Sequence, residues 1–252
     1  MSRIIDLKTW NPQGKKVLLY SGGLDSWCIS QIWKPDVLLY VNINGRYNKQ
    51  EMSHLPEDVV IENLDLSKWE RPDKIIPLRN LYLIMLASNY GDKICLGATA
   101  GDRVLDKSFT FAEKATDLLR YLYSPQWWNP TQRDIEVCLD FKDKTKTEIL
   151  QMYLDGGGSI EKAWKESFSC YEPDDEGHVC MSCKPCFRKF ISFAELGFID
   201  ESWLPTVIPY IGREIVPDIV AGTYGRGEKE EKQIMEIYNK YKDQYDEYFD
   251  NH

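Results

Sequence analysis

The stretch LLYSGGLDSW, residues 18–27, joins an apolar run to three small residues and an acid. A serine and two glycines directly after a strand allow a tight turn, whose backbone N–H groups form a concave anion site with the start of the next helix. Glycine suits this place because a Cβ would hinder a ligand and because positive φ angles are expected. A plain strand-to-helix turn is the alternative, but the full S-G-G-L-D-S favours a site for a nucleotide pyrophosphate.

The segments around this turn alternate between β-like and helical patterns. Four short apolar runs predict strands, at residues 15–20, 37–43, 59–66 and 93–98. Residues 79–91 have helical spacing and end at Gly91, a common residue at a helix end. Strands separated by helices predict an α/β fold with a parallel sheet, which binds ligands at the carboxyl ends of its strands. The glycine-rich turn and GATAGD (97–102) are both expected at that edge.

The remainder of the chain is expected to be mostly helical. Residues 109–165 are broken by a loop at 124–130 and by a glycine-rich segment at 155–159. Residues 228–249 carry apolar side chains at helical spacing, which predicts a stripe that packs on the body or on another subunit. The stripe consists of Ile234, Tyr238, Tyr241, Tyr245 and Tyr248.

The seven cysteines fall into two groups. Three of them lie in apolar surroundings and are expected to be small core residues: Cys28, Cys95 and Cys138. The other four fall within seventeen residues, at a spacing that suits one tetrahedral ion: Cys170, Cys180, Cys183 and Cys186. Zinc is the expected occupant, and a structural one, because four thiolates leave no open position. An iron–sulfur cluster is the alternative, and His178 is a spare ligand that four cysteines make unnecessary.

The bulk composition is that of a globular protein, with 252 residues, 28% of them charged and 43% hydrophobic. The formal net charge of −9 argues against a surface that binds nucleic acid directly. The N-terminus lacks the apolar core of a signal peptide and no run reaches the ~18 apolar residues of a membrane span, so a cytoplasmic protein without membrane contact is expected. The expected division is a nucleotide-binding domain at 1–150, a zinc-binding region at 151–202 and a C-terminal extension at 203–252 that ends in an amphipathic helix.

The run SGGLDS resembles the PP-loop of the N-type ATP pyrophosphatases, enzymes that cleave ATP to AMP and pyrophosphate. The resemblance implies a PP-loop domain, similar to the adenine-nucleotide alpha-hydrolases, in which the turn wraps the pyrophosphate end of ATP. Asp25 would organise that end through Mg²⁺. The implied ATP-binding residues of the turn are Tyr20, Ser21, Gly22, Gly23, Leu24, Asp25 and Ser26.

The cysteine segment resembles the C-terminal zinc motif of the 7-cyano-7-deazaguanine synthases. That motif has Ser-Cys-Tyr, then C-x-x-C-x-x-C, an arginine and a helix with a phenylalanine, here Ser169, Cys170, Tyr171, Cys180, Cys183, Cys186, Arg188 and Phe193. Further matches to the family, in chain order, are Gly45, Glu51, Pro77, Arg79, Asn80, Gly97, Asp102 and Lys146. The helical C-terminal region is therefore expected to be held together by zinc.

Two segments depart from that family's pattern, in the region the family uses around its substrate base. The Gly-Gln-Arg-His run expected at 45–48 reads Gly-Arg-Tyr-Asn. The Tyr-Pro-Asp-Cys segment expected after Asp102 is replaced by VLDKSF, with only Asp106 as a remnant. The last fifty residues have no counterpart in the family. Within them, GTYGRGEKEE (222–231) is interpreted as a solvated hinge before a helix, with a phosphate-contacting loop as the alternative.

The resemblance implies a ligase of queuosine biosynthesis that uses ATP with Mg²⁺ to convert 7-carboxy-7-deazaguanine and ammonium to 7-cyano-7-deazaguanine, and it implies a homodimer. The implied catalytic residues are Ser21, Asp25, Arg79, Asp102 and Lys146, with Arg79 and Lys146 on the α-phosphate. Asn80 and Gly97 are further nucleotide-binding positions. Glu51, Arg79 and Asp102 are the substrate-binding positions, although Glu51 and Asp102 are alternatively structural salt-bridge partners.

Three other functions are considered. A PP-loop tRNA thiolase usually needs a reactive cysteine or a metal cluster and a basic RNA surface, which the acidic charge and the zinc-like cysteines disfavour. A non-catalytic module that binds ATP and zinc is disfavoured by the intact SGGLDS, Arg79-Asn80 and Asp102. An enzyme that activates a deazaguanine acid for attachment to another molecule is not excluded by any feature of the sequence.

Overall fold

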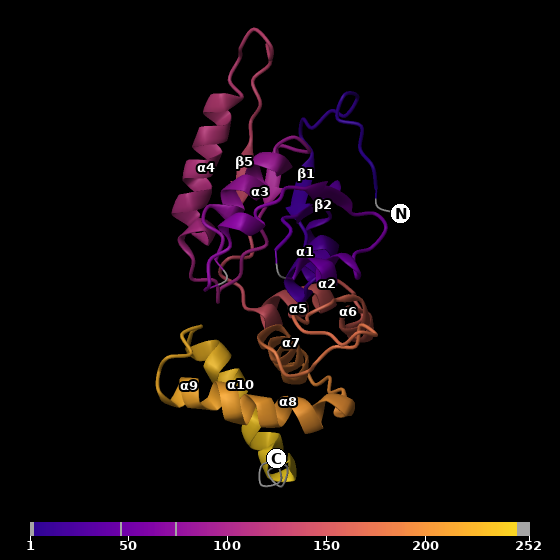
Figure 1. Ribbon diagram of the computed structural model, residues 1–252, viewed down its shortest axis with the longest axis vertical. Helices are drawn as coiled ribbons and strands as arrows, with labels where there is room; N and C mark the ends of the chain where they lie inside the picture. The colour runs from indigo at the N-terminus through magenta and orange to yellow at the C-terminus, as the bar shows by residue number, and fades with distance from the viewer. Residues whose placement is uncertain (1–2, 46, 74, 246–252) are drawn as a thin grey trace. The chain divides into compact units, whose positions relative to one another are not determined.

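The computed structural model describes residues 3–45, 47–73 and 75–245. The chain divides into two compact units, Met1–Asp143 and Lys144–His252 (Figure 1). The N-terminal unit holds the sheet, and the C-terminal unit is built from helices. The domain boundaries expected at 150 and 202 fall within helical segments, and that three-part division stays a prediction.

The sheet of the N-terminal unit has five parallel strands in the order β3-β2-β1-β4-β5. The strands are β1 (Lys16–Leu19), β2 (Val37–Asn42), β3 (Val60–Asn63), β4 (Lys93–Cys95) and β5 (Glu136–Cys138). In the centre, Val17 lies opposite Val37 on one side and Ile94 on the other. The predicted parallel α/β fold is therefore confirmed.

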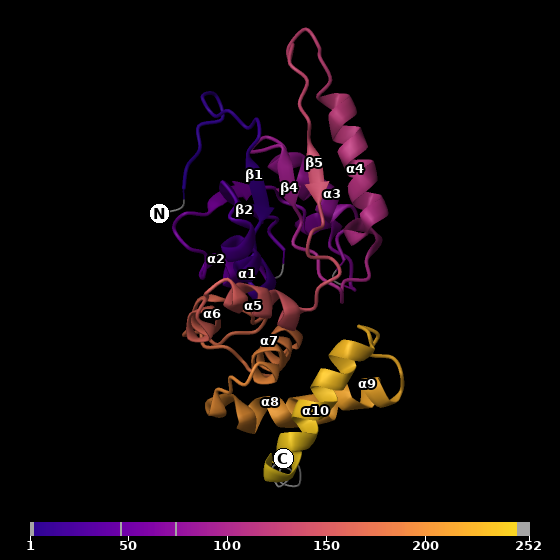
Figure 2. The same ribbon diagram turned by 180° about the vertical axis from the view of Figure 1, so that it is seen from behind.

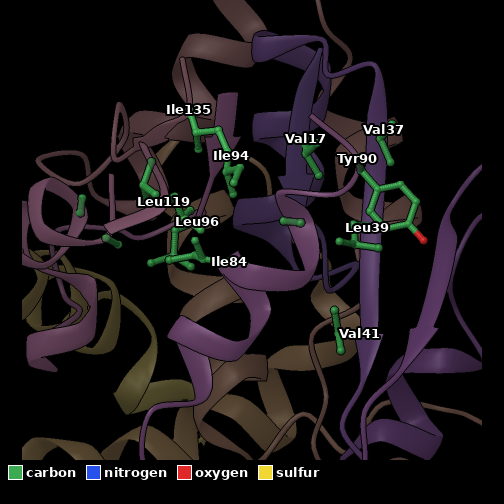
Figure 3. Close-up of a cluster of buried hydrophobic side chains, with 14 of the residues drawn as sticks. Val17, Val37, Leu39, Val41, Ile84, Tyr90, Ile94, Leu96, Leu119 and Ile135 are labelled. Atoms are coloured by element: carbon green, nitrogen blue, oxygen red, sulfur yellow. The ribbon is translucent and has the colours of Figure 1, made fainter. Parts of the chain in front are cut away.

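One face of the sheet packs against α3 (Arg79–Ala87) and α4 (Phe109–Leu122). Figure 3 shows the resulting cluster, in which Val17 and Ile94 of the sheet lie with Ile84 of α3 and Leu119 of α4. Leu18 points to the opposite face because side chains alternate along a strand, and it is fully buried as well. Both faces of the central strand are thus covered, as a parallel sheet requires.

The helix α1 (Leu24–Trp33) connects β1 to β2. Three short elements lie in the other connections: α2 (Asn48–Met52), η1 (Ser67–Trp69) and η2 (Leu105–Lys107). The three cysteines expected in the core are buried, since Cys28, Cys95 and Cys138 are each at most 5% exposed. Burial also raises the pKa of the Cys95 thiol to about 12, which keeps it protonated.

The fifth strand was not expected, because residues 109–165 were interpreted as helical apart from loops. After α4 the chain instead adds Glu136–Cys138 beside β4 (Figure 2). The backbone N–H of Val137 donates to Oγ1 of Thr116 on α4 at 2.9 Å, so the helix supports the strand directly. Three residues are too few to show an alternating pattern of their own.

The helix expected at 79–91 ends earlier, at Ala87. Gly91 does not cap it. A Cβ on Gly91 would lie 2.5 Å from the carbonyl oxygen of Lys15 and 2.7 Å from Cγ2 of Val17. Glycine is required here because the chain passes directly against the first strand as it enters β4.

The C-terminal unit is helical, as predicted. Its elements are α5 (Lys146–Asp155), α6 (Ile160–Glu166), α7 (Lys184–Glu195), η3 (Glu201–Trp203), α8 (Leu204–Tyr210), the π-helical turn η4 (Ile211–Ile215), α9 (Val216–Val220) and α10 (Glu228–Tyr245). The first of them begins with a capping box, in which Thr145 and Glu148 each bind the other's backbone N–H. Among the residues described, no helix has the length and apolar character to cross a membrane.

The apolar stripe of α10 packs on the C-terminal unit itself, as one of the two expected arrangements requires. Ile234 is fully buried in a cluster with Phe187 of α7 and Ile208 of α8, and three tyrosines of the stripe pack around it: Tyr238, Tyr241 and Tyr245. The remaining member, Tyr248, lies outside the described residues. The helices before and after residue 202 therefore share one hydrophobic core.

Candidate functional site

The strand order creates a switch point between β1 and β4. From β1 the chain continues to β2 and β3 on one side, whereas from β4 it continues to β5 on the other. Open parallel sheets bind ligands in the crevice at the carboxyl ends of the two strands that flank such a point. The glycine turn (residues 21–26) follows β1 and Gly97 follows β4, so the sequence placed both motifs correctly at this edge. The backbone has φ +76° at Gly22 and φ +65° at Gly97, which explains why both positions are glycine.

The glycine turn is closed by the hydroxyl of Ser26. This hydroxyl accepts the backbone N–H of Ser21 at 3.3 Å and donates to the carbonyl of Gly23 at 3.1 Å. The Ser21 hydroxyl lies 3.3 Å from it. Gly23 precedes α1 without any side-chain cap, and Asp25 is in the first turn of the helix. The turn thus combines small residues, hydroxyl groups and a helix N-terminus, which suits an anionic ligand.

The segment that contains Glu51 lies directly beside the glycine turn. A Cβ on Gly22 would be 3.8 Å from Cδ2 of Leu55, which lies after the end of α2, four residues beyond Glu51. The O–H of Tyr40 on β2 donates to Oε2 of Glu51 at 2.9 Å, and the side-chain amide of Asn48 donates to the Tyr40 oxygen. Burial raises the pKa of the Glu51 carboxyl, while the Tyr40 hydrogen bond and the charge of Arg79 partly oppose this rise.

Arg79 and Asn80 begin α3, after Leu78 with φ +60°. The Asn80 side chain is 3% exposed and donates from Nδ2 to the carbonyl of Asp106 at 3.4 Å. The start of α3 therefore interacts with two segments: the charge of Arg79 acts on Glu51, and Asn80 contacts the loop after β4.

Asp102 organises the loop after β4. Its Oδ2 accepts the backbone N–H of Thr99 at 3.0 Å and forms an ion pair with Nζ of Lys107, also at 3.0 Å. Nζ of Lys142 donates to the carbonyl oxygens of Thr99 and Asp102. These contacts make Asp102 a salt-bridge partner within the loop, as one of its two expected roles requires. Its contact with a substrate stays a prediction.

Lys146 belongs to the other unit. It is the first residue of α5 and lines a pocket of the C-terminal unit together with Arg188, Glu230 and Gln233. The other positions predicted to bind nucleotide or substrate lie in the N-terminal unit, and the role of Lys146 on a phosphate stays a prediction. Sequence reasoning missed Tyr40 and Asn48, because a tyrosine inside an apolar strand gives no signal of a polar partner.

The four-cysteine loop (Cys170, Cys180, Cys183 and Cys186) gathers at the start of α7. The four sulfur atoms all lie within 4.8 Å of one another. Zinc bound to four thiolates at ~2.3 Å requires sulfur separations of roughly 4 Å, so this donor set fits a single tetrahedral ion. An iron–sulfur cluster spreads its cysteines over several irons and is therefore a poorer fit to so compact a set.

The surroundings of these sulfurs support the same assignment. Cys186 is fully buried and Cys183 directly precedes α7. The neighbouring thiols of Cys183 and Cys186 lower the pKa of the Cys170 thiol, and the backbone N–H of Cys180 donates to its sulfur at 3.3 Å. His178 is exposed and binds Asp174 at 2.9 Å, so it is not part of the set.

Comparison with known proteins agrees with this arrangement. The family model of the queuosine biosynthesis protein QueC matches residues 38–197. Two curated relatives, the 7-cyano-7-deazaguanine synthases of Citrifermentans bemidjiense and of Geobacter sp. strain M21, are each 24% identical over 223 residues, covering 75% of this chain and 96% of theirs. That of Halobacterium salinarum is 24% identical over 148 residues, or 56% and 59%. No solved structure matches the chain.

The matched range has an informative extent. It includes Glu51, the Arg79-Asn80 pair, Asp102 and the four-cysteine loop, but it begins after the glycine turn and ends before α8. The glycine turn and the last helices therefore lie outside the matched range. Because the match covers more than half of the chain, this protein belongs to the QueC family.

Proposed function

We propose that this protein converts 7-carboxy-7-deazaguanine and ammonia to 7-cyano-7-deazaguanine at the expense of ATP. The observation that carries the proposal is the glycine turn at the switch point of a parallel sheet. In this turn Gly22 takes a left-handed conformation and the Ser26 hydroxyl accepts the backbone N–H of Ser21. The names of the relatives at 24% identity supply the substrate class.

The reaction needs activation of an unreactive group. A carboxylate is a poor electrophile because its leaving group would be oxide. Transfer of AMP from ATP to the acid releases pyrophosphate and gives an acyl adenylate, from which ammonia displaces AMP to form the amide. A second adenylation, on the amide oxygen, releases another pyrophosphate, and loss of AMP and a proton then leaves the nitrile. Two ATP are consumed for each product.

The residues of the chain act by positioning and by stabilising charge. The N–H groups of the glycine turn receive the pyrophosphate, and Asp25, in the first turn of α1, would hold the accompanying Mg²⁺. Arg79 supplies positive charge to the α-phosphate during its transfer. Asn80 and Gly97 shape the nucleotide side of the site.

Two carboxylates are proposed to bind the substrate. Glu51 and Asp102 accept hydrogen bonds from N–H groups of the guanine-like ring or from ammonia. A buried acceptor left unpaired by a wrong ligand costs binding free energy, so such contacts favour the correct base. Zinc at the four-cysteine loop stabilises the C-terminal unit and leaves no coordination position for chemistry.

A second candidate is an enzyme that activates the same acid for attachment to another molecule. The ion pair of Asp102 with Lys107 favours it, because this lysine lies in the segment that departs from the synthase pattern. Lys107 adds a cation where the substrate base is expected, and a changed substrate or product would follow from that change.

One assay distinguishes the candidates. The purified protein is incubated with ATP, Mg²⁺, ammonium and 7-carboxy-7-deazaguanine, and AMP and product mass are followed together. Nitrile with two AMP for each product supports the synthase. AMP formation that stops at the adenylate or the amide favours the second candidate, and a protein that forms no AMP contradicts the choice of acid.

A further inference from the structure

We infer that Tyr40 and Asn48 are positioning residues that hold the Glu51 carboxylate for N–H donors of the substrate. The inference rests on the proposed function, in which Glu51 binds the substrate. It concerns a hydrogen-bonded chain that begins at the backbone of Gly45 and ends at Glu51, referred to below as the Tyr40 network (Tyr40, Asn48 and Glu51).

The network is fixed at each step. Oδ1 of Asn48 accepts the backbone N–H of Gly45 at 2.6 Å, which orients the amide so that its NH₂ group faces the oxygen of Tyr40. The Tyr40 oxygen is thereby an acceptor, so its one proton is directed to Oε2 of Glu51. Tyr40 is 3% exposed and Asn48 8% exposed, so water does not readily compete for these contacts.

The arrangement leaves Glu51 with capacity to bind a ligand. A carboxylate accepts about four hydrogen bonds, and Tyr40 uses one position on Oε2. Among the residues that the structure describes, no donor to Oε1 is found, and the nearby positive charge is that of Arg79 on α3. The segment of Glu51 reaches the glycine turn through Leu55, which lies beside Gly22. An ionised carboxylate that accepts two parallel N–H groups suits the amidine-like edge of a guanine-type base.

The network is a feature of this chain. Asn48 stands at the place where the synthase pattern has histidine, and in this chain its amide joins Tyr40 to the loop at Gly45. Within residues 3–45, 47–73 and 75–245, the groups with charge or a titrating proton that act on Glu51 are Tyr40 on β2 and Arg79 on α3. Burial and the Glu51 charge raise the pKa of Tyr40, so the tyrosine stays protonated and keeps donating.

The sign of the pH effect follows from these contacts. Glu51 must be ionised to accept N–H groups, so substrate binding weakens as the pH falls through its pKa. The Tyr40 hydrogen bond lowers that pKa against the effect of burial. Removing the hydroxyl in Tyr40→Phe therefore raises the pKa of Glu51 and shifts the acid limb of the pH profile to higher pH.

The test compares kcat/KM for 7-carboxy-7-deazaguanine across pH in the wild type, Tyr40→Phe and Asn48→Ala. Tyr40→Phe is expected to raise KM for the acid about tenfold at a pH near the limb, with KM for ATP unchanged. Asn48→Ala is expected to shift the limb in the same direction by less, because it frees the Tyr40 proton to point elsewhere. Neither change should occur if the network only supports the fold.

Tyr90→Phe is the matched control. Tyr90 is 2% exposed and its O–H donates to a carboxylate, that of Glu62 on β3, but it belongs to the core cluster away from the glycine turn. It should leave the acid limb in place. An active wild type whose limb is unmoved by Tyr40→Phe overturns the positioning role alone, whereas a wild type that forms no AMP from this acid overturns the proposed function together with it.

Discussion

The glycine turn of the N-terminal unit and the four-cysteine loop of the C-terminal unit both lie at the start of a helix, α1 and α7 respectively. The turn offers backbone N–H groups, and its shape is held by the hydroxyls of Ser21 and Ser26. The loop offers side-chain sulfurs, and Cys183 and Cys186 belong to the hydrophobic core of their unit. The glycine turn keeps its shape through its own hydrogen bonds and can bind a ligand without depending on it for folding. An ion at the four-cysteine loop would instead be part of what holds the C-terminal unit folded.

Cys183→Ser should give the largest effect and tests whether the four-cysteine loop depends on a metal for folding. Structural zinc contributes on the order of 10 kcal/mol to folding, so loss of one ligand should release the metal and lower the melting temperature strongly. Zinc content and thermal unfolding measure this. Cys95→Ala, which truncates a buried cysteine outside the set, should retain zinc. A wild type that is stable without metal would contradict the assignment.

Asp25→Asn should affect chemistry and leave the fold intact. The side chain lies in the first turn of α1, in the proposed Mg²⁺ and pyrophosphate site. We expect AMP formation to fall about 10²–10³-fold, as for loss of one charge-stabilising group, and the melting temperature to change little. Asp117→Asn, on an exposed position of α4, is the control. Normal AMP formation in Asp25→Asn would refute the role of the turn.

Glu230→Gln should give the smallest effect and tests whether the stability of the four-cysteine loop depends on the last helices. This carboxylate accepts the Tyr224 O–H at 2.6 Å and pairs with Arg226 at 3.1 Å and Arg188 at 3.4 Å. Its neutralisation should cost about 1–3 kcal/mol of unfolding free energy, with zinc retained. Glu228→Gln, exposed at the start of the same helix, should cost much less. Loss of zinc in Glu230→Gln would mean that the last helices hold the metal site together.

The hinge expected at 222–231 illustrates the limit of sequence reasoning. The glycines at 222, 225 and 227 have positive φ, as a turn requires, but Tyr224 and Arg226 fold back onto Glu230 instead of facing solvent. Local composition signals the turn. The contacts of Glu230 with these two residues and with the distant Arg188 depend on how the helices pack, which local composition does not predict.

Features carried by short contiguous patterns were predictable. The glycine turn, the four cysteines and the apolar strands each depend on a few neighbouring residues whose chemistry explains the structure they form. The missed features depend on tertiary neighbours. Strand β5 exists because β4 and Thr116 offer partners, and Gly91 is needed because Lys15 passes beside it. The Tyr40 network likewise joins a strand to a helix that follows it.

The strand order also governs when the nucleotide edge is complete during synthesis. Lys16 of β1 pairs with Lys93 of β4, and Lys93 pairs in turn with Glu136 of β5. Pairings so distant in sequence form slowly, because loop-closure entropy is lost before contacts compensate for it. The glycine turn leaves the ribosome well before β4, the neighbouring strand with which β1 pairs. The turn and β1 therefore remain without part of their final surroundings until β4 is made, and the edge of β1 that β4 covers is where a nascent chain would depend on protection from aggregation.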